Sequence, residues 1–162
     1  MSERTDKLRS LGISELVIAL ADGSSVHRGF RNYVFEDEDR PVSDFAFPEG
    51  YPEFLPISQY DQGVIGCWLQ DGRLEFISVA MEEYPQHRVI ALSEQGLWYW
   101  LFVDVIDNGK SGTWQDEEEA LAELREIASI TGFSLVDDAW EFQSHYDWDQ
   151  NARDEKCRSV AG

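Results

Sequence analysis

Carboxylates are the groups in this sequence whose number and spacing could do chemistry, and eight of the 32 form two uninterrupted runs of four. The runs are Glu36, Asp37, Glu38 and Asp39, and Asp116, Glu117, Glu118 and Glu119. Carboxylates can ligate calcium, work in pairs as acid and base, or bind cationic groups. The first run lacks the alternating spacing and the glycine of a calcium loop, so we expect a charged, solvated face there.

Other chemistries lack their usual residue patterns. His27, His87 and His145 are scattered, and neither Cys67 nor Cys157 has a partner two residues away, so no zinc pattern is present. No serine lies in a Gly-x-Ser-x-Gly elbow, and the glycines of residues 63–66 precede no Lys-Ser/Thr pair, which indicates turn and close-packing glycines. We therefore predict a protein that is not an enzyme and binds no metal or cofactor.

One enzymatic alternative stays open near the C-terminus, where acids alternate with aromatic residues. Tryptophan rings stack on sugars, and two carboxyl groups about 5 to 10 Å apart can act as acid and base on a glycosidic bond. The residues that could build such a carbohydrate site are Asp137, Asp138, Trp140, Glu141, Asp147 and Trp148.

Charge is the strongest compositional signal. The 162-residue chain has 32 acidic and 13 basic residues, a formal charge of −19. Such a field repels nucleic acid and anionic membranes, and it accelerates encounter with a basic partner. Because a negative charge also serves solubility, a purely solubilising role is the competing interpretation.

The compartment can be predicted from what is missing. The most apolar run, residues 97–106, contains Asp104 and is too short to cross a bilayer core of about 30 Å. No signal-peptide pattern precedes the first charged residues, and there are only two cysteines. We expect a cytoplasmic protein without a membrane span.

The first third of the chain favours a short helix and a hairpin. Residues 3–11 can form a helix that Gly12 ends. Residues 16–20 and 26–35 are rich in β-prone residues and are separated by Asp22-Gly23, which predicts a hairpin. A helix over residues 14–21 with Gly23 as its cap is the competing interpretation. Residues 40–56 contain several prolines and predict a long connection.

The centre of the chain predicts a second hairpin followed by a buried helix. Residues 55–69 and 74–80 flank Asp71-Gly72, a strong hairpin signal. Residues 88–92 can add a short strand. Ser93 is a plausible N-cap for a helix whose residues 97–106 are apolar on nearly every face, which is typical of a helix packed in the core, here against the sheet.

The last third predicts an amphipathic helix and then weaker elements. Thr113 with Asp116 three residues later resembles a helix start, an apolar stripe follows, and Gly132 ends the helix. Residues 133–136 can form a last strand, and the chain from about residue 151 suggests a frayed tail. Together these elements predict a single domain over residues 1–162 of the α+β class, with a mostly antiparallel sheet of about five or six strands and packed helices.

The central segment resembles the SMI1/KNR4-like (SUKH) superfamily over residues 55–107. The resemblance lies in Leu55-Pro56-Ile57-Ser58 leading into a glycine-containing loop, a strand with Cys67, the Asp71-Gly72 turn, the next strand, and a helix that opens at Ser93 with a bulky apolar face. It implies a similar mixed fold. It also implies a role shared by many bacterial members, which are immunity proteins that neutralise toxins, often nucleases.

An immunity role agrees with the charge, because a nuclease displays basic groups for phosphate that an acidic surface can occupy. On this hypothesis the partner is a basic protein such as a toxin, and the sequence leaves the oligomeric state undetermined. A DNA mimic that blocks many nucleic-acid-binding proteins is a further alternative. The expected partner surface consists of both acidic runs with aromatic anchors: Glu36, Asp37, Glu38, Asp39, Trp114, Asp116, Glu117, Glu118, Glu119 and Trp148.

Overall fold

A computed structural model describes residues 3–24, 26–33, 54–60, 63–80 and 87–161 of the chain. These residues form two compact units, residues 1–89 and residues 90–162, and each has buried apolar side chains of its own. The fold class is α+β, as predicted. That the whole chain is one domain stays a prediction.

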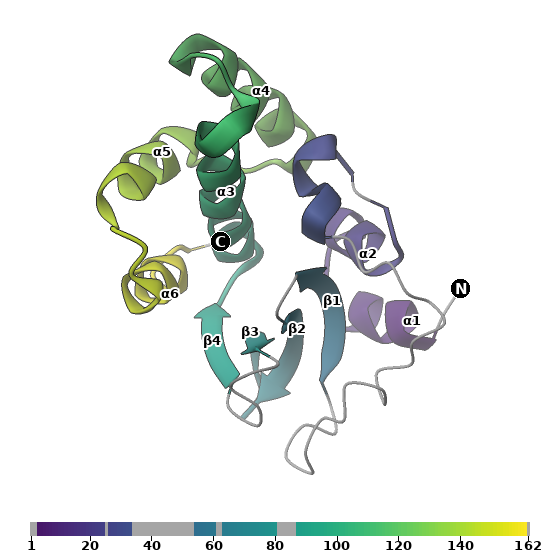
Figure 1. The fold of residues 1–162 in the computed structure, drawn as a ribbon. Coiled ribbons are helices and arrows are strands. Elements are labelled where there is room, and N and C mark those ends of the chain that lie inside the picture. Colours follow the sequence, from purple (N-terminus) through teal and green to yellow (C-terminus); the bar gives the residue numbers. More distant parts are fainter. Residues whose placement is uncertain (1–2, 25, 34–53, 61–62, 81–86, 162) are drawn as a thin grey trace. The chain divides into compact units, whose positions relative to one another are not determined.

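The first unit is built on an antiparallel sheet of four strands in the order β1-β2-β3-β4 (Figure 1). The strands are β1 (Leu55–Tyr60), β2 (Gly63–Gln70), β3 (Arg73–Ala80) and β4 (His87–Ala91), of which β4 ends just beyond the unit. At the turn between β2 and β3, Asp71 and Gly72 have φ of 53° and 78°. Both central residues are left-handed, as a type I′ turn requires, so the predicted hairpin is confirmed.

One face of this sheet is covered by a small apolar cluster. Its members are Phe54, Val64, Trp68, Ile77 and Val79. Trp68 lies opposite Glu75 in the register and donates from Nε1 to the Glu75 carboxylate at 3.0 Å, which satisfies both groups in a buried position. Gly66 lies between Val64 and Trp68 on β2, and a Cβ atom there would collide with the Phe54 ring. Gly66 is therefore a close-packing glycine, as predicted.

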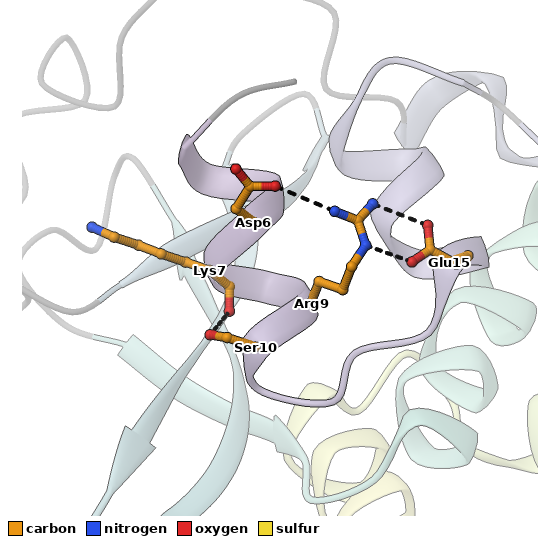
Figure 2. A network of polar contacts seen from close by, with 5 residues as sticks. All are labelled: Asp6, Lys7, Arg9, Ser10 and Glu15. Carbon is orange, nitrogen blue, oxygen red and sulfur yellow. Dashed lines mark hydrogen bonds and ion pairs between the residues drawn. The ribbon is translucent and has the colours of Figure 1, made fainter.

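Two short helices, α1 (Glu3–Ser10) and α2 (Glu15–Ala21), lie beside β1 (Figure 1). Gly12 follows α1 with φ of 83°, which confirms the predicted helix end. Arg9 joins the two helices, because its guanidinium donates to both oxygens of Glu15, at 2.7 and 3.1 Å, and to Asp6 at 3.3 Å (Figure 2). The fully buried Leu8, Val17 and Leu20 supply the apolar side of this helix pair.

The hairpin predicted over residues 16–35 is wrong, and the competing helix is correct. The Ser14 hydroxyl accepts from the amide of Val17 and caps α2. Gly23, with φ of 93°, bonds back to the carbonyl of Leu20 and so ends a helix instead of turning a hairpin. Beyond it, Arg28–Tyr33 forms the 3-10 helix η1.

The sheet accordingly has four strands in the part of the chain that the structure describes, not five or six. The local β propensity of residues 16–20 is overridden by the Ser14 cap and by burial at helical spacing. Residues 133–135 form no strand either, and Val136 begins a helix.

The second unit is helical and is organised around α3 (Glu94–Asn108). The short turn η3 (Gly109–Thr113), α4 (Glu117–Thr131), α5 (Val136–His145) and α6 (Gln150–Arg158) follow it. Ser93 caps α3 by accepting from the amide of Gly96 at 3.0 Å, as predicted. Both α5 and α6 pack against α3, which explains why an all-round apolar helix is stable here. The packing of α3 on the sheet stays a prediction.

The expected frayed tail is instead helix α6, which is locked onto α3. The buried Arg153 stacks its guanidinium 3.5 Å from the centre of the Trp100 ring and pairs with Asp104 at 2.8 Å. It also donates to the carbonyl of Trp100 at 2.7 Å. Cys157 is fully buried, and this burial raises the pKa of its thiol to about 12. Because the sequence of α6 is mostly polar and charged, its composition does not predict these buried contacts.

Candidate functional site

The start of α4 places the second acidic run. Asp116 is the N-cap residue, and its carboxylate accepts from the amide of Glu119 at 2.8 Å. Glu119 reaches back and accepts from the amide of Gln115 at 2.9 Å. The helix therefore begins three residues later than the expected Thr113 cap, with a reciprocal arrangement of the capping-box kind. All four acids are exposed. Asp116 and Glu119 make the capping hydrogen bonds, while Glu117 and Glu118 extend from the helix.

The turn before α4 fixes Trp114. Its amide donates to the carbonyl of Gly109 at 2.9 Å, an i to i−5 bond that makes one π-helical turn at the end of α3. The Trp114 ring lies against Gly109 so closely that a Cβ atom there would overlap it. Its Nε1 donates to Glu123 at 2.8 Å. Trp114 is thus half-buried, and both its backbone amide and its indole N–H are hydrogen-bonded.

Trp114 and Trp140, the latter from α5, form the walls of a surface hollow that we call the tryptophan notch. The two ring centres are 6.3 Å apart and the planes are inclined by 41°. The hollow has a volume of about 240 Å³ and is lined by Lys110, Trp114, residues 115–117, Ala120 and Trp140. The sequence-predicted residues Trp114, Asp116 and Glu117 are therefore brought together, with Glu118 and Glu119 in the same helical turn.

A lysine already occupies part of this notch. The Lys110 ammonium lies 4.2 Å from the centre of the Trp140 ring. It also donates to the Gln143 side chain at 2.6 Å, and Gln143 donates in turn to the buried carboxylate of Asp107 at 2.6 Å. This chain of contacts holds a cation over an aromatic face, which is a favourable electrostatic arrangement.

The field at the notch is negative. Four carboxylates begin α4, and the helix N-terminus offsets only about half a unit charge. Lys110 contributes one positive charge, and Glu123 adds a further carboxylate behind Trp114. A cationic group is therefore the ligand that the charges here favour.

Trp148 lies elsewhere, in the turn between α5 and α6. The amide of Asp149 bonds to the carbonyl of Tyr146 at 3.0 Å, and the two central residues, Asp147 and Trp148, have φ of 53° and 60°. This is type I′ geometry, in which glycine or asparagine is usual. Trp148 is 65% exposed, and its role as an aromatic anchor stays a prediction.

Two acids of the carbohydrate alternative, Asp138 and Glu141, have other partners. Asp138 accepts from the Tyr99 hydroxyl and pairs with Lys156 at 3.2 Å, and the hydrogen bond from Tyr99 first, then Lys156, holds the pKa of Asp138 below its usual value. Glu141 pairs with His145 at 2.9 Å. The carboxyl group that acts as the acid of a glycosidase requires a raised pKa. The pKa of Asp138 is shifted in the opposite direction.

Glu36, Asp37, Glu38 and Asp39, the first acidic run, lie outside the described residues. Sequence reasoning missed Lys110 as a notch residue and assigned Trp140 only to the carbohydrate alternative. The one available signal was Gly109, a glycine near Trp114 that could have indicated close packing of a ring.

Searches of family models, curated proteins and solved structures gave no match to this chain. Membership of the SMI1/KNR4-like superfamily therefore stays a prediction. The described residues contain no helix with the length and apolarity of a membrane span. They also contain no cluster of three His, Cys, Asp or Glu side chains placed to hold a metal ion.

Proposed function

We propose that the protein is a non-catalytic binding protein that captures a basic protein partner on an acidic surface. The observation that carries the proposal is the start of α4, where Glu117 and Glu118 are exposed beside the tryptophan notch. Exposed carboxylates next to half-buried indoles combine charge complementarity with aromatic contact area, and aromatic residues are enriched among the energetically important residues of interfaces.

The charge of the whole chain supports a basic protein over other partners. At −19, the field repels phosphate-bearing nucleic acids and anionic membranes, and it raises the association rate with a cationic surface. Such steering is weakened by salt, because exposed charges are screened beyond about 8 Å at physiological ionic strength.

The more specific proposal is that this partner is a toxin, and that the protein is its immunity protein. The resemblance of residues 55–107 to SMI1/KNR4-like proteins motivates this proposal, and the acidic surface is compatible with the basic phosphate-binding site of a nuclease toxin. The protein would neutralise such a toxin by covering those basic groups.

The experiment is to express each gene adjacent to this one, alone and together with the protein, and to measure growth. Rescue of a toxic neighbour, and a dissociation constant that rises between low and high salt, are the expected results. The variant Glu117→Lys/Glu118→Lys should weaken binding roughly tenfold or more. The control Asp137→Lys/Glu155→Lys makes the same charge change at exposed acids of α5 and α6 and should leave most of the affinity.

Glu117→Gln/Glu118→Gln separates lost attraction from added repulsion, and it should give an intermediate affinity. If no neighbour is toxic and no basic neighbour product binds, the immunity proposal is wrong, and screening Trp148 and its acidic neighbours against glycans is the next step. If both charge reversals weaken binding equally, the partner responds to net charge and the α4 surface is not its site.

A further inference from the structure

The tryptophan notch can hold a cation, because the Lys110 ammonium already lies over the Trp140 ring. The ammonium is 4.2 Å from the ring centre. In the same unit, the buried Arg153 guanidinium stacks only 3.5 Å from the centre of Trp100. A planar guanidinium can therefore approach an indole more closely than Lys110 approaches Trp140, and it stacks on the ring where an ammonium cannot.

The size of the hollow limits what it can hold. Its volume of about 240 Å³ is below the roughly 300 to 1,000 Å³ of typical small-molecule sites, so a single side chain is a better fit than a free ligand. The ring centres are 6.3 Å apart, less than twice the 3.5 Å seen for Arg153 on Trp100. A guanidinium midway between the two ring centres would lie closer to each indole than Arg153 lies to Trp100, so stacking on one of the two indoles is the better fit.

Carboxylates at the rim complete the arrangement. Asp116 and Glu117 line the hollow, and carboxylates bind guanidinium through paired, charge-assisted hydrogen bonds. Trp114 is held by Gly109 and Glu123, so this wall is oriented before any partner arrives. Preorganisation of this kind lowers the entropy cost of binding.

We propose that the tryptophan notch is the receptor for one arginine side chain of a protein partner, whose guanidinium stacks on Trp140 in place of Lys110 and pairs with the carboxylates at the start of α4. The proposal rests on the proposed capture of a basic partner and assigns the contact that anchors it. Lys110 is then an internal competitor, which keeps the Trp140 face covered until an arginine displaces it.

The test uses N-acetyl-arginine methylamide as the probe and N-acetyl-citrulline methylamide as its neutral match. Each is titrated into the full chain at constant ionic strength while the indole N–H signals are followed by NMR. The signals of Trp114 and Trp140, assigned from single substitutions, should shift with the arginine probe and not with the citrulline probe. Equal shifts with both probes, or no shift with arginine, would overturn the proposal.

Lys110→Met provides the decisive variant, because it removes the competitor from an exposed position and leaves both tryptophans in place. Its affinity for the arginine probe should rise roughly two- to fivefold, the range of exposed cation–π contacts. Lys156→Met is the matched control, since Lys156 also lies near a ring, that of Tyr99 at 5.8 Å, but does not line the notch. An equal gain in both variants would indicate net charge alone and contradict the proposal.

Trp140→Leu should abolish the shift of Trp114 with the arginine probe, with near-UV circular dichroism reporting whether the fold is kept. The outcomes separate the two proposals. If the probe does not bind but a basic neighbour product is still captured through Glu117 and Glu118, the arginine receptor is wrong and the proposed function stands. If the probe binds the notch but no basic protein is captured, the notch binds guanidinium groups, but the proposed function is wrong and so is the role of the notch in anchoring a protein partner.

Discussion

Trp148 is a residue whose conformation and exposure both work against stability. At φ of 60° a side chain with a Cβ atom costs roughly 1 to 2 kcal/mol relative to ordinary helical backbone. The ring recovers part of this by packing near Tyr146, with centres 6.1 Å apart, yet 65% of the side chain stays exposed. Strain at an exposed aromatic residue is a reasonable sign of a functional role.

A pair of substitutions tests this interpretation. Glycine usually destabilises a protein relative to alanine, but at a left-handed position the order reverses. We predict that Trp148→Gly is more stable than Trp148→Ala by about 1 kcal/mol, measured by chemical denaturation. If the alanine variant is the more stable one, the turn does not hold Trp148 in the left-handed conformation. Both variants should weaken partner binding if Trp148 is an anchor.

At the scale of elements, the second unit is held by a polar clamp between α3 and the end of α5. Asp107 on α3 accepts from the Tyr146 hydroxyl at 2.5 Å and from Gln143 at 2.6 Å. Burial is the main influence on this carboxyl and raises its pKa, although both hydrogen bonds and Arg153 oppose the shift while Asp104 adds to it. Through Gln143 the clamp also positions Lys110.

The raised pKa gives a pH dependence with a definite sign. An acid whose pKa is higher in the folded state contributes its full stability below the unfolded pKa of about 3.9, and loses it as pH rises through the folded pKa. The Asp107→Asn variant does not lose stability in this way as pH rises, and its Oδ1 can still accept a hydrogen bond from Gln143. We predict that the free energy of unfolding of the variant, relative to wild type, increases from about pH 4 toward neutrality and then levels off.

The measurement is urea denaturation of both proteins across this pH range, so that every other titrating group cancels in the difference. A difference that stays constant with pH would show that the Asp107 pKa is the same folded and unfolded. A difference that decreases with pH would mean that the hydrogen bonds from Tyr146 and Gln143 outweigh burial.

The elements that could be predicted are those whose local signals agree with their tertiary contacts. The Asp71-Gly72 hairpin, α3 after Ser93 and α4 before Gly132 each have a turn or cap residue beside an unambiguous pattern. Helix α2 was ambiguous, because a run of β-prone residues was short enough to be either element, and the Ser14 cap decided it. Helix α6 was missed because its stability comes from burying Arg153 against Trp100, a contact between residues far apart in the sequence.

The candidate site divides in the same way. The acids at the start of α4 and Trp114 could be predicted from charge and helix position. The notch itself could not, since it needs Trp140 from α5 and the π-helical turn after α3 that carries Lys110 and folds Trp114 over Gly109. No sequence rule sets that turn apart from an ordinary helix end.

At the scale of the whole molecule, the balance of charges decides how salt acts on the fold. With 13 basic and 32 acidic residues, the acidic side chains cannot each have a basic residue of their own. The exposed pairs, such as Lys7 with Glu3 at 3.2 Å, are each worth little. Repulsion arising from the net charge of −19 therefore outweighs attraction, and it destabilises the compact state.

We predict that sodium chloride raises the melting temperature, with most of the rise below about 0.3 M, because the screening length falls from about 30 Å at 0.01 M to 10 Å at 0.1 M. Each kcal/mol gained corresponds to about 2 to 4 °C for a chain of this length. A rise that is linear up to molar salt would indicate exclusion of the salt from the surface instead of screening, and a fall would mean that ion pairs dominate. Since the same salt should weaken capture of a basic partner, binding lost while the melting temperature rises cannot be due to unfolding.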